Sequence, residues 1–171
     1  MRVYTVGHGT RAAEELVALL QRANIETLID VRRYPGSRRN PQFNQGALAD
    51  VLAASWIAYR HAEALGGRLS NEPGEERFGC IRTPAFRSYA ARMGTPEWQE
   101  ALAAALAEPA PCFMCAETAW TRCHRQLIAE LLVARGHQVL HLLPDHVERH
   151  RLSDDAEARN GRLYLCGALV A

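Results

Sequence analysis

Two thiols, a carboxylate, an imidazole and a guanidinium fall within eleven consecutive residues of this chain. They belong to Cys115, Glu117, Cys123, His124 and Arg125. A thiol near a helix N-terminus, beside arginine or protonated histidine, has a lowered pKa and becomes more nucleophilic. We therefore expect nucleophilic or redox thiol chemistry here. Cys123 is favoured as the nucleophile because charged residues flank it, and Cys115 is the second candidate.

Two further ionisable side chains complete the candidate catalytic group. Glu117 is a candidate general acid or base if it is partly desolvated, since burial raises the pKa of a carboxyl group. A role as the ion-pair partner of a nearby arginine is equally open. His124 is the other candidate proton carrier. His8 lies between Gly7 and Gly9, where a ligand can come close to the backbone, and we expect it to contact substrate.

The cysteines allow other interpretations. Cys112 and Cys115 have the spacing of a zinc-binding knuckle, and Cys123 and His124 could complete four ligands. The residues between the first two are apolar, and in a strand these two cysteines would face opposite sides. We therefore expect no metal and no other cofactor. A switching disulfide between Cys115 and Cys123 stays open, as does a structural role for both as buried, inert thiols.

All twenty basic residues are arginines, and four of them crowd the segment 32–39. A guanidinium group presents a rigid fork of donors that suits phosphate or carboxylate, so we expect a small anionic ligand. The predicted substrate-binding residues are His8, Arg32, Arg38, Arg68 and Arg125. Asp30 lies within an apolar run, and we expect this buried carboxylate to pair with Arg32 or with a loop amide.

Apolar runs and helical patterns alternate along the chain. Strands are expected at 2–6, 27–31, 56–60, 111–115 and 138–143, with an edge strand at 162–166. Helices are expected after Thr10 and at 46–55, 83–93, 96–106 and 121–135. This alternation predicts an α/β fold: a single three-layer domain over 1–171, with a mostly parallel central sheet of about five strands flanked by helices.

Polar segments directly follow four of the expected strands, at 7–9, 32–40, 61–68 and 117–125. Loops that follow the strands of a parallel sheet all emerge at its carboxyl edge. We therefore expect these four segments to converge on one cleft.

Composition limits the class of protein. The 171 residues are 48% hydrophobic and 23% charged, which is typical of one globular domain. No apolar run approaches the roughly 20 residues that span a bilayer, and no signal peptide is recognisable. We expect a cytoplasmic protein without a membrane partner, whose five cysteines are thiols, ligands or redox pairs rather than structural disulfides. We assign no role to Cys80 or Cys166, and we expect His137, His146 and His150 at the surface.

Several of these motifs together resemble the family called domain of unknown function 488, over residues 4 to about 145; nothing is carried over to the tail 146–171. The resemblance rests on Thr5-Val6-Gly7-His8, Ile29-Asp30-Val31-Arg32, Leu65-Gly66-Gly67-Arg68, Cys115-Ala116-Glu117 and Cys123-His124-Arg125. It implies an α/β fold and a shared pocket, but no established reaction. It also implies one constellation that pairs Cys115 with Cys123 and leaves Cys112 out.

Two classes of function follow as expectations. The first is an enzyme that uses this Cys/Glu/His/Arg constellation on a small phosphate- or nucleotide-like anion. The second is a nucleic-acid-binding or regulatory module that uses the arginine-rich loop 32–39. The net charge of +1 provides no global attraction for nucleic acid, so we favour the enzyme.

Overall fold

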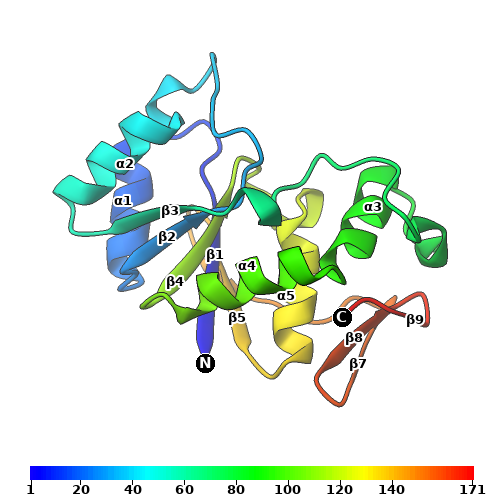
Figure 1. Ribbon diagram of the computed structural model, residues 1–171. Helices are drawn as coiled ribbons and strands as arrows, with labels where there is room; N and C mark the ends of the chain where they lie inside the picture. Colours follow the sequence, from blue (N-terminus) through cyan, green and yellow to red (C-terminus); the bar gives the residue numbers. More distant parts are fainter.

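The structure, a computed structural model, describes residues 1–171. Its centre is a six-stranded sheet in the order β3-β2-β4-β1-β5-β6 (Figure 1). The strands are β1 (Arg2–Gly7), β2 (Thr27–Asp30), β3 (Ala58–His61), β4 (Pro111–Cys115), β5 (Gln138–Leu142) and β6 (Val147–Arg149). All neighbouring pairs are parallel except β5 and β6. The predicted α/β fold is confirmed, with one more strand than the five expected.

Helices cover both faces of this sheet. They are α1 (Ala13–Arg22), α2 (Gln45–Ala54), α3 (Pro84–Met93), α4 (Pro96–Ala107) and α5 (Arg125–Ala134). Strand β4 shows how the two layers divide, because its successive side chains point to opposite faces. Cys112 and Met114 pack in the core beneath α1 and α2, whereas Phe113 and Cys115 pack in the core beneath α3, α4 and α5.

The tail forms a second, antiparallel sheet of β7 (Ala156–Arg159), β8 (Arg162–Leu165) and β9 (Ala168–Leu169). Figure 1 shows this sheet beside α5 rather than at the edge of the central sheet. Its residues Leu163, Leu165 and Val170 join the core beneath α5. The segment 162–166, which was predicted as an edge strand, therefore contains β8, the middle strand of a separate three-stranded antiparallel sheet.

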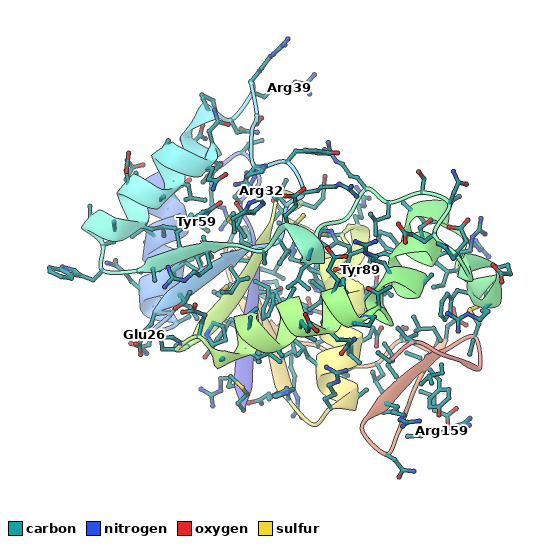
Figure 2. The ribbon with its side chains drawn as sticks, in the orientation of Figure 1. Glu26, Arg32, Arg39, Tyr59, Tyr89 and Arg159 are labelled. Atoms are coloured by element: carbon teal, nitrogen blue, oxygen red, sulfur yellow. A yellow bond between two sulfur atoms is a disulfide. The ribbon has the colours of Figure 1, made fainter.

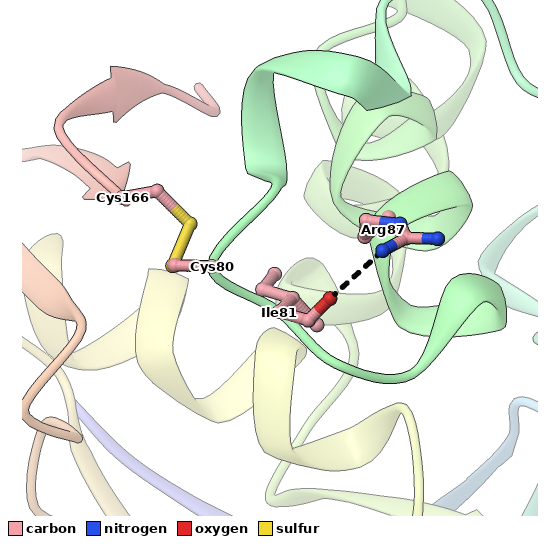
Figure 3. Close-up of a disulfide and its surroundings, with 4 residues drawn as sticks. All are labelled: Cys80, Ile81, Arg87 and Cys166. Carbon is pink, nitrogen blue, oxygen red and sulfur yellow. Dashed lines mark hydrogen bonds between the residues drawn. A yellow bond between two sulfur atoms is a disulfide. The ribbon is translucent and has the colours of Figure 1, made fainter.

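A disulfide joins Cys80, in the loop before α3, to Cys166 in the tail (Figure 3). The expectation that the cysteines form no structural disulfide is wrong for this pair. The two residues are 86 positions apart, and their Cα atoms lie 5.7 Å apart only because the tail sheet packs back against the body. Nothing in the local sequence around either cysteine reveals this proximity.

Two element boundaries also differ from the prediction. Strand β3 begins at Ala58 because Trp56 adopts a positive φ of 59° and its side chain is 95% exposed. Helix α5 begins at Arg125 rather than at residue 121, after a single 3-10 turn at Trp120–Arg122. Cys123 therefore precedes the helix in extended backbone. None of the helices combines the length and apolar character that a membrane crossing requires.

Candidate functional site

A cavity of about 350 Å³ opens at the carboxyl edge of the sheet. All four polar segments that were predicted to converge contribute to its wall, as the parallel strand order requires. Helix α3 adds a fifth contribution that the sequence did not suggest. The side chains lining the cavity include His8, Arg32, Arg33, Tyr34, Ser37, Asn40, Arg68, Phe86, Cys115, Glu117, Arg122, Cys123 and His124.

Two thiols and one imidazole meet in this cavity. The Nδ1 atom of His124 lies 3.6 Å from the Cys123 Sγ atom and 4.0 Å from the Cys115 Sγ atom. The other ring nitrogen, Nε2, donates a hydrogen bond to the Val31 carbonyl over 3.1 Å. Because a carbonyl only accepts, the proton of the neutral ring is on Nε2. Nδ1 faces the sulfur atoms of both cysteines.

The two thiols have opposite ionisation tendencies. The hydrogen bond with Cys123 and burial raise the pKa of Cys115 to about 12. Burial alone would also raise the pKa of Cys123, but the hydrogen bond from Cys115 and the charge of Arg125 outweigh it and lower this pKa to about 6. These opposite shifts make Cys123 the thiol of the pair that ionises first.

Close packing holds the imidazole in place. A Cβ atom on Gly67 would lie 2.7 Å from the His124 Nδ1 atom, so only glycine fits against the ring here. On another side the ring of Tyr89 lies 4.9 Å away between centroids, and the Tyr89 hydroxyl donates to the Leu65 carbonyl. The loop after β3 and helix α3 thus fix the His124 ring against the thiols.

Arg125 lies behind the site rather than in the cavity. It is 1% exposed, and its guanidinium donates to the Thr5 hydroxyl over 3.2 Å and to the Glu117 carbonyl. The sequence places it directly after His124, and we expected it to hold substrate. The turn into α5 instead directs it beneath the loop, where its charge stabilises the Cys123 thiolate.

Arg32 is anchored by a buried carboxylate. Asp30 is fully buried and accepts from the Arg32 backbone N–H, Nε and Nη2 atoms over 3.0, 2.8 and 2.6 Å. The Tyr59 hydroxyl donates to the same carboxylate over 2.6 Å, and Arg32 also donates to the Phe43 carbonyl. The prediction that Asp30 pairs with Arg32 or with a loop amide is confirmed on both counts.

His8 completes this arrangement as a neutral imidazole. Its Nδ1 atom donates to the Gly9 carbonyl over 2.8 Å, and its Nε2 atom accepts from Arg32 over 3.2 Å. Burial lowers the pKa of His8 to about 4, and its ring stacks on Phe43 with centroids 4.2 Å apart. Arg32 and His8 therefore line the cavity with most of their hydrogen-bonding capacity already used.

The remaining predicted residues lie at the rim or outside it. Arg68 and Glu117 are exposed at the cavity wall, so Glu117 is not desolvated there. Arg38 is exposed and does not line the cavity. The adjacent Arg39 points away from the body at the outer tip of the loop (Figure 2).

Sequence reasoning did not select several residues that line the cavity. The cationic ones are Arg33 and Arg122, which are direct neighbours of the selected Arg32 and Cys123. Tyr34 and Phe86 add aromatic surface. Adjacency to a selected residue was the available signal for the arginines, but it cannot distinguish side chains that point inward from those that point outward.

One group of side chains could hold a metal ion. The ligand atoms of Cys115, Cys123 and His124 lie within 4.8 Å of one another, a set of the kind that binds thiophilic divalent ions. Cys112, which would have completed the knuckle, is fully buried in the core on the opposite face of β4. The knuckle spacing therefore does not correspond to a ligand pair.

Comparison with known proteins gives a match to one protein family. The family described as "Domain of unknown function DUF488" matches residues 12–132, a stretch that includes Arg32, Cys115, Cys123 and Arg125 but not His8. No curated protein and no solved structure matches the chain. The family match covers more than two thirds of the chain, so this protein belongs to the DUF488 family.

Proposed function

We propose that this protein is an enzyme that acts on a small anionic substrate through the Cys123 thiol. One observation carries the proposal: the paired thiols and the His124 imidazole lie in a cavity whose wall bears Arg33, Arg68 and Arg122. A nucleophile and an anion-binding wall in one cavity are what covalent catalysis on a phosphate- or nucleotide-like substrate requires.

Each residue has a distinct role in this proposal. The three arginines bind the anionic group through charge-assisted hydrogen bonds. Cys123 Sγ donates its electron pair to the electrophilic atom of the substrate, and the leaving group departs with the electron pair of the broken bond. Cys115 donates a hydrogen bond to the attacking sulfur. Glu117, whose exposed side chain lines the cavity, accepts a proton from the water that releases the bound product.

A redox variant of this chemistry uses the same atoms. The Cys123 thiolate attacks one sulfur of a substrate disulfide, forms a mixed disulfide and expels the other sulfur as a thiolate. Cys115 then attacks the mixed disulfide at Cys123, forms the Cys115–Cys123 disulfide and releases the second substrate thiol. The substrate gains two electrons, which two external thiol equivalents must restore to the protein. The shared cavity position of both sulfur atoms supports this variant as well.

Site-resolved alkylation against pH tests the proposal. We expect iodoacetamide to modify Cys123 well below pH 8, to leave Cys115 unmodified, and to be slowed by inorganic phosphate or a nucleotide in the cavity. The matched control is Cys112→Ala, which removes a thiol from the opposite face of β4 and should leave the profile unchanged. Each measurement is made with and without a chelator, so that a bound metal ion cannot mask the thiols. A folded protein whose Cys123 stays inert up to pH 9 contradicts the proposal.

We also propose a cytoplasmic location, supported by a site that needs reduced thiols. The Cys80–Cys166 disulfide is the feature that opposes it, because structural disulfides are rare in reducing compartments. Trapping the thiol state of the protein in intact cells decides the matter. Reduced Cys115 and Cys123 support the cytoplasm, and full oxidation of both the Cys80–Cys166 and the Cys115–Cys123 pair contradicts it.

The second candidate function is nucleic-acid binding by the loop 32–39. Arg38 and Arg39 are exposed outside the cavity, beside the 63% exposed Tyr34, which favours this function. Phosphate contacts make affinity fall steeply as salt rises. Negligible binding of DNA and RNA at low salt, or identical binding by an Arg38→Ala/Arg39→Ala variant, eliminates this candidate.

A further inference from the structure

A chain of buried polar side chains leads from Arg125 away from the cavity. Its members are Thr5 on β1, His141 on β5, Glu130 on α5 and His150 directly after β6. Each is at most 3% exposed, and none lines the cavity. His150 was expected at the surface, and it is buried because the edge strand β6 directs it back beneath α5.

These groups form an unbroken series of contacts. The Thr5 hydroxyl lies 2.7 Å from the His141 Nδ1 atom, as expected for residues paired across β1 and β5. The His141 Nε2 atom lies 3.0 Å from the His150 Nδ1 atom. The His150 Nε2 atom lies 3.5 Å from a Glu130 carboxylate oxygen, and Glu130 also accepts from the Ser153 backbone N–H.

One arrangement of protons gives every contact between Arg125 and His150 both a donor and an acceptor. Arg125 can only donate, so it occupies a lone pair of the Thr5 oxygen and leaves the hydroxyl hydrogen for His141. His141 then carries its proton on Nε2 and donates to His150. The His150 Nε2 atom then faces the Glu130 carboxylate at 3.5 Å, an electrostatic contact rather than a hydrogen bond. Burial lowers the pKa of His141 to about 3, so this imidazole is neutral, as the scheme requires.

The series also joins two buried charges of opposite sign. An uncompensated buried charge is strongly destabilising, and neither the Arg125 guanidinium nor the Glu130 carboxylate has a direct salt-bridge partner other than the His150 contact. The hydrogen bonds that run from Arg125 to His150, and the electrostatic contact from His150 to Glu130, align the intervening dipoles with both charges. Each end therefore stabilises the orientation of the other.

Trp120 links this chain to the thiol loop. Its ring stacks on His141 with centroids 4.3 Å apart and an interplanar angle of 9°, and its edge meets His150 at 5.0 Å. Trp120 lies between Cys115 and Cys123 in the sequence, so the loop that carries the thiols rests directly on the two imidazoles.

We infer that Thr5, His141, His150 and Glu130 form a positioning relay that fixes the Arg125 guanidinium behind Cys123. None of the four touches the cavity, so they act through Arg125 and are not catalytic residues. The inference builds on the proposed role of Cys123 and names residues that regulate its reactivity. Other charged or titratable groups also face this region, namely Arg11, Cys112, Cys115, Arg122 and His124. The test must therefore change the relay alone.

Thr5→Val is the most selective perturbation, because valine keeps the shape of threonine in this fully buried position and removes only the hydroxyl. We expect the rate of Cys123 alkylation at pH 7 to fall by about 3–10-fold when Arg125 loses this anchor. Thr5→Ser restores the hydroxyl and should restore the rate. A Thr5→Val protein that is folded and reacts like the parent overturns the relay, as does a Thr5→Ser protein as slow as Thr5→Val.

Nitrogen NMR of the histidine side chains gives a second readout that does not depend on thiol reactivity. We expect His141 in the parent to be a neutral ring with its proton on Nε2, and this signature to change in Thr5→Val. A proton on His141 Nδ1 in the parent overturns the relay. If Cys123 is inert in the parent, the proposed function fails, and the NMR result then decides the relay by itself.

Discussion

Replacing Asp30 with asparagine should reveal how strongly the buried ion pair stabilises the cavity wall. The substitution keeps the shape of the side chain and removes its charge. The fully buried carboxylate accepts hydrogen bonds from three Arg32 nitrogen atoms and from the Tyr59 hydroxyl. Arg32 is itself only 7% exposed, so solvent cannot replace the lost partner.

The magnitude follows from these contacts. Removing one partner of a buried ion pair costs about 3–5 kcal/mol, because the other charge stays buried without compensation. Both oxygens of the Asp30 carboxylate accept hydrogen bonds, whereas the NH2 group of asparagine can only donate. At least one hydrogen bond is therefore lost in either orientation of the amide. Tyr59→Phe removes a single hydrogen bond to the carboxylate at a half-buried position, and it should cost about 1.5 kcal/mol.

Urea titration followed by circular dichroism measures both losses of unfolding free energy. The surface substitution Arg38→Ala is the control and should stay within about 0.5 kcal/mol of the parent. The denaturant dependence should be unchanged if only the native state is affected. A loss below about 1 kcal/mol for Asp30→Asn would refute the reasoning, as would equal losses for Asp30→Asn and Tyr59→Phe.

Three further predictions concern other parts of the molecule. Gly67→Ala should displace the His124 ring, which should lower the unfolding free energy measured by urea titration by about 1–3 kcal/mol and change the alkylation rate of Cys123. An unchanged free energy together with an unchanged rate would contradict the close packing of Gly67 against the ring. Cys166→Ser should lower the unfolding free energy by about 2–5 kcal/mol, and reduction of the parent with dithiothreitol should reproduce that loss. The pKa of His8 is 6.5 in the unfolded chain and about 4 in the folded protein, so the unfolded state binds the proton more tightly. The contribution of His8 to the free energy of unfolding is therefore fully present above pH 6.5 and is lost as the pH falls towards 4. After discounting for partial solvent screening this loss is roughly 2–3 kcal/mol, and a His8→Gln variant with the same pH dependence as the parent would contradict it.

Local patterns were sufficient to predict most of the fold. The apolar runs that form β1, β2, β4 and β5 are short and bounded by polar segments, so alternation with helices predicted a parallel sheet. The same reasoning brought the four polar segments to one cavity. The added strand β6 escaped prediction because a three-residue edge strand carries almost no periodic signal.

The candidate site was predictable to the level of segments and not of individual side chains. Cys115 and Cys123 meet as expected, but Arg125 turns inward while its neighbour Arg122 lines the cavity. The turn between them decides this, and sequence alone does not give its geometry. His150 and the Cys80 disulfide were missed for a related reason, since both depend on tertiary contacts with elements distant in sequence.

The disulfide divides the polypeptide into a closed ring and an open arm. The ring runs from Cys80 to Cys166 and contains both cavity thiols and Arg122, whereas the arm before it carries Arg33 and Arg68. Unfolding with the disulfide intact therefore separates the nucleophile from most of the anion-binding side chains. The ring stays closed by its disulfide, whereas the arm becomes an open, flexible chain. During refolding, anion binding and thiol activation should therefore appear together, in the step in which the arm packs against the ring.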